Sequence, residues 1–460
     1  MNKFLAEKLV EIEQITKEMG LDPYPINYEV VPQEVMLEVI SYGLPTRARH
    51  WSYGQAYDYQ KMQGEMGFSK IYEVVLNNNP SYAFLLDTNS DVANTMVCAH
   101  VVGHVHFFKH NYMFKKTDNK MVYHAAEGAQ RIEEYIEKYG INAVEKVMDM
   151  GFAMDKAIDW HKGVSRKRYG GPKKVLKETS FDEYDDVLGD GDLSHREILH
   201  SAGFPPHPEY DLLWFLTEYA PLESWQRDIF TIIREESYYF YPQYMTKIMN
   251  EGFASFIHAE MMLNIPSLSS KDYIDFCKIH ERVVQPGANK LNINPYFLGF
   301  SILGDVKKRW DEKFENDESE INGMEKIYEI IDTENDISFV RNYLTKELAE
   351  DLQLFAYRKL KNRNGDEIIK ITSLDLEEIA ESIVGDLYNY RAPSICVTKA
   401  SQTGLELEHH SIDIGTLDEK HLEKVMEYLY EIWSSPINLK TIDENGEEIH
   451  YTYDELGFSG

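Results

Sequence analysis

The hydrophobic pattern over the first hundred residues shows two different periods. Residues 3–19 and 33–43 carry apolar side chains three and four positions apart, which predicts two amphipathic helices. Residues 70–78 and 80–89 are dense in β-branched and aromatic side chains and predict two strands. A long helix is expected next, at about 90–110. This part of the chain therefore combines helices with a small sheet.

Farther along the chain, the helical period dominates. Residues 121–161 have a helical pattern with a break at Gly140. Residues 224–241 predict a strong helix, and we expect Pro242 to end it because proline lacks the backbone N–H that a helix interior needs. The next helix is expected to start directly afterwards, over 243–263. These segments predict a predominantly helical core.

The tail of the chain changes character. A hairpin signal, Asn364-Gly365 between two apolar runs, marks a connecting segment over residues 351–384. Residues 385–460 predict two strand pairs and one amphipathic helix. We therefore expect an α+β fold with a helical core over 1–350, the hairpin segment, and a small C-terminal α+β domain over 385–460. A zincin-like arrangement is one alternative for the core.

Composition limits the possible partners. The chain of 460 residues carries a formal charge of −31, so its surface repels nucleic-acid phosphates and anionic lipids. The three cysteines lie far apart and predict no disulfide framework, which suits a reducing compartment. No run of about 18 apolar residues occurs, so we expect a soluble cytoplasmic protein with no membrane insertion.

Histidines cluster in the stretch "VCAHVVGHVHFFKHN" at residues 97–111. On a helix with about 3.6 residues per turn, His100 and His104 share one face, whereas His106 and His110 lie on another. This His-x₃-His spacing suits two metal ligands. Zinc peptidases with that spacing carry a catalytic Glu after the first histidine, but this chain has Val101. Gly103, between the pair, would let another backbone approach closely.

A zinc site needs a further ligand, and Glu251 in "NEGFASFIH" is the best candidate. The set of His100, His104 and Glu251 resembles that of the gluzincin branch of zinc metallopeptidases, so a divalent metal, zinc first, is the expected cofactor. Small residues beside Glu251 would allow tight helix packing. The acid or base could be Glu236 or His258, with Glu73 and Glu235 as further candidates.

Longer blocks of sequence resemble the stage V sporulation protein R family of bacteria. The blocks include "RARHWSYGQAY" (47–57), "KIYEVVLNNNPSYAFLLDTN" (70–89), the histidine stretch, and residues 225–258. The chain departs from the family's usual pattern at two positions: His106 replaces a typical Asp, and Phe253 replaces a typical Trp. If that Asp were the missing base, its replacement would put activity in doubt.

The resemblance implies a cytoplasmic protein that acts in the mother cell of a spore former, during formation of the peptidoglycan cortex. It also implies two protein partners: an AAA+ serine-kinase-like protein and a von Willebrand A-type protein. Two functions stay open. One is a metal-dependent hydrolase or transferase acting at an amide bond, with a degenerate zincin-like site. The alternative is a non-catalytic adaptor whose motif helices form a packed core and whose surface binds these partners.

Overall fold

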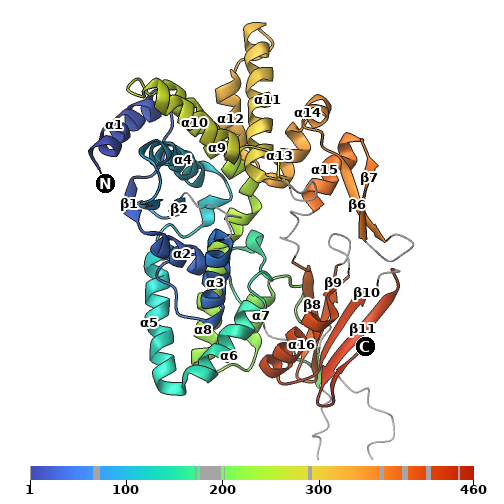
Figure 1. Cartoon of the computed structure of the whole chain (residues 1–460). Helices are drawn as coiled ribbons and strands as arrows, with labels where there is room; N and C mark the ends of the chain where they lie inside the picture. The colour runs from blue at the N-terminus through green and yellow to red at the C-terminus, as the bar shows by residue number, and fades with distance from the viewer. Residues whose placement is uncertain are drawn as a thin grey trace, which may run out of the picture. The chain divides into compact units, whose positions relative to one another are not determined.

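The structure is a computed structural model of the whole chain, shown in Figure 1. It describes residues 2–65, 73–170, 174–176, 198–200, 203–287, 293–361, 367–385, 392–410, 416–443 and 446–460. Most residues between 171 and 202 lie outside these ranges. Among the residues described, no helix combines the length and the apolar character needed to cross a bilayer.

Two compact units make up the chain, and neither is continuous in sequence. Unit 1 contains Met1–Glu145 and Glu235–Arg391, and unit 2 contains Lys146–Arg234 and Ala392–Gly460. This division differs from the sequence-based one, which assigned residues 146–234 to the core. The fold class is α+β, as expected.

A three-stranded sheet forms one layer of unit 1. Its strands are β1 (Ile26–Val31), β2 (Glu73–Leu76) and β3 (Ser81–Leu86), in the order β1-β3-β2. β1 runs parallel to β3, and β2 pairs antiparallel with β3. β2 therefore lies at an edge of the sheet. β2 and β3 are the two strands that the sequence pattern predicts. Helices α1 (Lys3–Glu18), α2 (Gln33–Tyr42) and α3 (Trp51–Glu65) belong to the same half of the unit.

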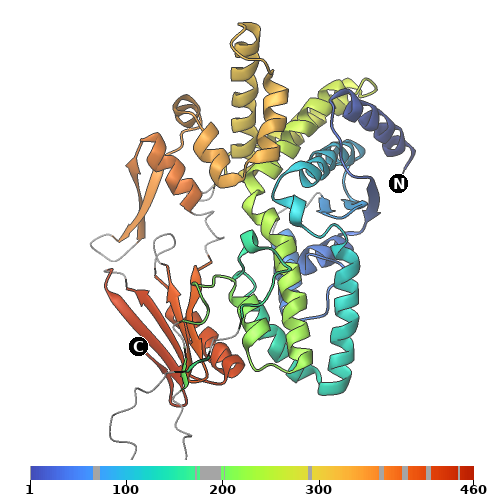
Figure 2. The same cartoon turned by 180° about the vertical axis from the view of Figure 1, so that it is seen from behind.

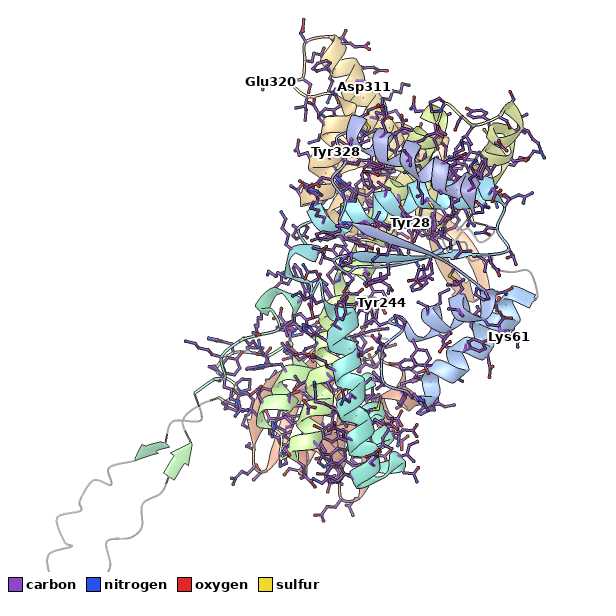
Figure 3. The ribbon with its side chains drawn as sticks, turned by 90° about the vertical axis from the view of Figure 1, so that its left-hand side faces the viewer. Tyr28, Lys61, Tyr244, Asp311, Glu320 and Tyr328 are labelled. Atoms are coloured by element: carbon purple, nitrogen blue, oxygen red, sulfur yellow. The ribbon has the colours of Figure 1, made fainter. Side chains whose placement is uncertain are left out.

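Helix α4 (Asp91–His110) lies between this sheet and α9 (Lys247–Asn264), as Figures 1 and 2 show from opposite sides. Ser90 caps α4, because its side chain accepts a hydrogen bond from the N–H of Ala93. Nearly all of α4 is buried, which explains its almost continuous apolar sequence. Tyr28 of β1, labelled in Figure 3, donates a hydrogen bond to the carbonyl of Cys98 and ties the sheet to the helix.

Two more helices pack near α4 and α9. α10 (Ser270–Val283) contacts both of them, and α11 (Pro295–Glu315) packs along α9. α11 and α12 (Gly323–Thr333) form a hairpin whose tip carries Asp311 and Glu320 (Figure 3). The other elements of unit 1 are η1 (Phe114–Lys116), α5 (Met121–Tyr139), α13 (Asp336–Tyr343), α14 (Lys346–Asp351), β6 (Ala356–Lys361), β7 (Glu367–Ser373) and α15 (Leu376–Gly385).

Unit 2 is built on a five-stranded sheet in the order β12-β11-β10-β9-β8. As predicted, the antiparallel pairs β8–β9 and β10–β11 flank one amphipathic helix, α16. β9 and β10 are parallel neighbours on either side of this crossover. The elements are α6 (Ile141–Phe152), η2 (Trp160–Lys162), β4 (Lys174–Leu176), β5 (Ile198–His200), α7 (Leu212–Tyr219), β8 (Ile395–Ser401), β9 (Gly404–His409), α16 (Glu419–Trp433), β10 (Ile437–Ile442), β11 (Glu448–Asp454) and β12 (Gly457–Ser459).

The prediction that Pro242 ends its helix is wrong. α8 (Ser224–Met245) continues through Pro242, and the break before α9 falls at Thr246. An interior proline removes one backbone hydrogen bond, which costs about 3 kcal/mol. The side chain of Thr246 donates to the carbonyl of Pro242 at the C-terminal end of the helix. The proline therefore precedes the end of the helix by one turn and does not set it.

Candidate metal centre

Two glycines bring the helices of the site close together. A Cβ on Gly103 of α4 would lie 2.7 Å from the Cα of Ala254, and one on Gly252 of α9 would lie 2.5 Å from Gly299 of α11. Real Cβ atoms do not approach neighbours so closely, so only glycine fits at these crossings. The close approach predicted for Gly103 and for the small residues of α9 is confirmed.

The pair His100 and His104 lies on the face of α4 that these crossings bury, and both side chains are almost inaccessible to solvent. Their Nδ1 atoms point toward α9. His100 Nδ1 lies 2.8 Å from His258 Nδ1, and His104 Nδ1 lies 2.9 Å from Asn250 Oδ1. An Asn carbonyl oxygen only accepts, so His104 donates from Nδ1, and in the neutral ring its Nε2 carries the lone pair.

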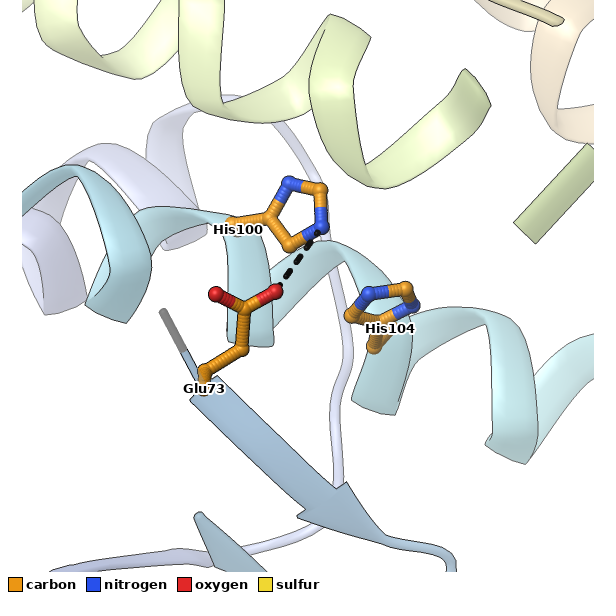
Figure 4. Close-up of side chains that lie close together, drawn as sticks. All are labelled: Glu73, His100 and His104. Atoms are coloured by element: carbon orange, nitrogen blue, oxygen red, sulfur yellow. Dashed lines mark ion pairs between the residues drawn. The ribbon is translucent and has the colours of Figure 1, made fainter. Parts of the chain in front are cut away.

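Both Nε2 atoms face carboxylates. Glu251 Oε2 lies 3.7 Å from Nε2 of His100 and 3.4 Å from Nε2 of His104. Glu73, from the edge strand β2, brings Oε1 to 3.6 Å from His100 Nε2, and Figure 4 shows its carboxylate pointing toward the two rings. One donor atom each from Glu73, His100 and His104 lies within 4.8 Å of the others. Four side chains from three elements thus converge.

Burial and charge act against each other in this cluster. Burial raises the pKa of Glu73, and attraction to the two histidines offsets it only in part. Burial would also raise the pKa of Glu251, but the adjacent imidazoles hold that pKa well below its usual range. For His104, burial favours the neutral form, yet the nearby Glu251 raises its pKa overall. The site thus favours charge on Glu251 and disfavours it on Glu73.

Two polar atoms in the middle of the cluster, His100 Nε2 and Glu251 Oε2, are buried and have no hydrogen-bond partner. Buried polar atoms of a folded protein nearly always have partners, because an unsatisfied one costs about 1–3 kcal/mol. Ligands about 2.0–2.1 Å from a tetrahedral zinc ion lie about 3.3 Å apart, close to the separations found here. The donor set and its spacing therefore fit a divalent metal.

The side chains of Glu73 and Glu251 are 16% and 18% exposed, whereas the two imidazole side chains are 5% exposed or less. Tyr296, at the start of α11, hydrogen bonds to Glu251. Burial and the two nearby carboxylates raise the pKa of Tyr296 well above its ordinary value, so its hydroxyl keeps its proton. Tyr296 therefore brings a neutral hydroxyl group to the cluster.

The other predicted site residues lie in different surroundings. His258 stands behind His100 and contacts it, while Glu236 forms an ion pair with Arg47 at 2.6 Å. His106 lies on a different face of α4, where its ring accepts the N–H of Asp22 and contacts Phe253. The two departures from the family pattern thus touch each other.

Sequence reasoning missed Asn250, His280 and Tyr296. Asn250 could have been suspected, because it precedes Glu251 and lies on the turn that faces α4. Tyr296 and His280 come from helices whose approach to α4 has no local signal in the sequence.

The fold and the cluster define a class: an α+β protein with a buried helical site of two histidines and two carboxylates. The family model described as "SpoVR like protein" matches residues 2–391, so this chain belongs to the SpoVR family. It is 30% identical over 95% of its length to Uncharacterized protein YcgB of Escherichia coli (strain K12), of which the match covers 92%. No solved structure matches the chain.

Proposed function

We propose that this protein is a metal-dependent enzyme whose His100, His104 and Glu251 hold a divalent cation. The observation that carries the proposal is the pair of buried atoms without partners, His100 Nε2 and Glu251 Oε2, which face each other at 3.7 Å. A cation between them would satisfy both. Two imidazoles and one carboxylate are a set that catalytic zinc sites use, which favours zinc and a zincin-like chemistry.

Glu73 takes the role that Val101 cannot fill. A cation held there would act as a Lewis acid and would supply an activated water near neutral pH. The Glu73 carboxylate lies within 4.8 Å of donor atoms of both histidines. From there it would take the proton of the attacking water and return it to the leaving amine. The reaction proposed is hydrolysis or transfer at an amide bond.

The family resemblance suggests a setting for this reaction. We propose a peptidoglycan precursor or a partner protein as the substrate, in the cytoplasm of the mother cell where the host forms spores. The AAA+ serine-kinase-like and von Willebrand A-type proteins are the proposed partners. The non-catalytic adaptor has less support, because a packed core would leave no pair of facing polar atoms unsatisfied.

The test is metal binding by the full chain. We expect elemental analysis to find about one zinc per chain, and calorimetry with zinc alone to detect binding to protein stripped by a chelator. His100→Ala/His104→Ala should lose this binding while keeping the circular dichroism spectrum. His110→Ala, on another face of the same helix, is the matched control and should bind zinc normally. A wild-type protein that binds no divalent metal would sink the proposal.

Glu73→Gln separates a base from a ligand. If Glu73 accepts the proton, the variant keeps its zinc affinity and loses hydrolysis of a panel of peptidoglycan stem peptides and unfolded proteins. General-base groups contribute about 10²- to 10⁴-fold to a rate. A variant whose zinc affinity falls as far as that of the double histidine variant would instead make Glu73 a ligand.

A further inference from the structure

A row of three imidazoles leads away from the candidate metal centre. His100 Nδ1 lies 2.8 Å from His258 Nδ1, and His258 Nε2 lies 2.7 Å from His280 Nδ1 on α10. Both distances are those of hydrogen bonds. His258 is fully buried, and His280 is partly buried. The sequence-based role of His258, an acid or base, does not explain why a third histidine stands behind it.

We propose that His258 and His280 are positioning residues that hold His100 in its metal-binding tautomer. The inference rests on the proposed function and deepens it. A neutral imidazole carries one N–H and one lone pair. A metal at Nε2 of His100 therefore requires the proton on Nδ1, and this N–H must donate to Nδ1 of His258.

That donation fixes every other group in the row. His258, accepting at Nδ1, carries its own proton on Nε2 and donates it to Nδ1 of His280. His280, accepting at Nδ1, has its proton on Nε2. If His280 were missing, the N–H of His258 would be buried without an acceptor, and the tautomer that serves the metal would lose the hydrogen bond that favours it. The orientation of His100 therefore depends on a residue of α10.

The surroundings leave the row with few alternatives. The ring of Phe276 lies against His258 and His280, with centroid distances of 6.3 and 5.7 Å, and the ring of Phe300 lies 5.1 Å from His280. Aromatic rings offer no strong acceptor to an imidazole N–H. Nδ1 of His280, 2.7 Å away, is therefore the acceptor for the Nε2–H of His258.

Two substitutions at His280 test the idea, with zinc alone as the probe. His280→Leu removes the acceptor, and we expect the dissociation constant for zinc to rise by about 10- to 100-fold, as for other groups that orient a metal ligand. His280→Gln keeps an acceptor oxygen near Nδ1 and should bind zinc within a few-fold of wild type. His110→Leu is the control for loss of a histidine. Equal zinc affinity in His280→Leu and wild type would overturn the inference.

Nuclear magnetic resonance of zinc-loaded wild-type protein, with ¹⁵N-labelled histidine, gives a second readout that a purely structural role would not produce. We expect the proton of His258 on Nε2 and that of His100 on Nδ1. Finding the His258 proton on Nδ1 would contradict the inference while leaving the metal site intact. If wild-type protein binds no zinc at all, the proposed function fails first. The two failures are thus distinguishable.

Discussion

Two clusters of buried charge, one in each unit, differ in how their polar atoms are satisfied. In the unit 1 cluster, His100 Nε2 and Glu251 Oε2 have no partner. In the unit 2 cluster, the carboxylates of Glu209 and Asp211 are fully inaccessible to solvent and are surrounded by donors. Both clusters bury acidic side chains, yet of these carboxylates only that of Glu251 has an oxygen without a hydrogen-bond partner. The difference indicates that the unit 1 cluster is a ligand site and that the unit 2 cluster stabilises the fold.

The donors of the unit 2 cluster come from several segments. Glu209 accepts hydrogen bonds from Lys162 and from the hydroxyl of Tyr169, and it forms an ion pair with Arg166. Asp211 caps α7 through the N–H of Trp214 and pairs with Arg234 at 2.8 Å. Backbone pairing of Glu209 with Val397 joins this region to β8. The cluster thus connects the two sequence segments that make unit 2.

Breaking the unit 2 cluster should have the largest effect on stability. Arg234 also donates to the carbonyls of Gly163 and Val164, so Arg234→Met leaves several buried acceptors without their donor. Removing one partner of a buried ion pair costs about 3–5 kcal/mol. We expect urea unfolding followed by tryptophan fluorescence to show a loss of this size. Zinc affinity should not change, because Arg234 takes no part in the unit 1 site.

The control for Arg234→Met is an exposed pair of the same chemistry. Arg341 binds Glu381 through two hydrogen bonds of 2.7 and 2.8 Å, but both side chains are about half exposed. Exposed pairs contribute about 1 kcal/mol or less. Arg341→Met should therefore lower the free energy of unfolding much less than Arg234→Met does. Similar losses for the two variants would show that burial does not set the value of the unit 2 pair.

The helix crossings beside the unit 1 cluster give the second prediction. Gly103→Ala places a Cβ 2.7 Å from the backbone of Ala254, so α4 and α9 must move apart. Overpacking of this kind costs about 1–3 kcal/mol. Because His100 and Glu251 sit on the two separated helices, the variant should also bind zinc more weakly. Thermal unfolding and zinc titration measure the two effects.

Gly304→Ala is the matched control for this substitution. Gly304 lies inside α11, and a Cβ there would meet nothing within 4 Å. An alanine in a helix interior is favoured over glycine by about 1 kcal/mol. We expect Gly304→Ala to be slightly more stable than wild type, with unchanged zinc affinity. If Gly103→Ala behaved in the same way, the close crossing would not be what positions the site.

The sequence pattern predicts the core of the unit 1 cluster but not its surroundings. His100, His104 and Glu251 follow from spacing on helices, since a period of 3.6 residues places them on defined faces. Glu73 could be named only as one of several candidate bases, because the approach of β2 to α4 depends on tertiary packing. The contacts of Asn250, His280 and Tyr296 have the same origin. Local periodicity determines which residues share a face of a helix, whereas the elements that pack against that face depend on long-range packing.

The fold shows the same limit. The strands β2 and β3, the helix α4 and the strand–helix order of the tail follow from local patterns and agree with the structure. The prediction that Pro242 ends its helix is wrong because it considers only the local free-energy cost of an interior proline. Tertiary packing of the helix outweighs that cost. The sequence pattern also could not predict which segments make up unit 2. Residues 146–234 join the tail through long-range contacts such as that of Glu209 with Val397. The local sequence around Glu209 contains no pattern that indicates pairing with a residue 188 positions later.

Asp336 gives the third prediction, because its carboxylate is buried like those of the two clusters but has two backbone donors and, among the described residues, no charged partner. Its carboxylate is fully buried and accepts the N–H groups of Ile248 and Met249, so it caps α9 just before Glu251. Burial raises the pKa of Asp336 from 3.8 to about 7, and the two N–H bonds only partly oppose this. The folded protein therefore holds a proton that the unfolded chain releases between about pH 4 and pH 7.

A raised folded-state pKa gives stability that is present at low pH and is lost as pH rises through that pKa. Between pH 5 and pH 7, Asp336 should lower the free energy of unfolding by up to about 1.4 kcal/mol per pH unit. Asp336→Asn cannot titrate, so its stability should fall less steeply in urea unfolding of metal-free protein over this range. Asp418→Asn removes the charge of an exposed cap whose pKa is lowered, so its curve should stay parallel to wild type. Parallel curves for wild type and Asp336→Asn would mean that the α9 cap is charged throughout.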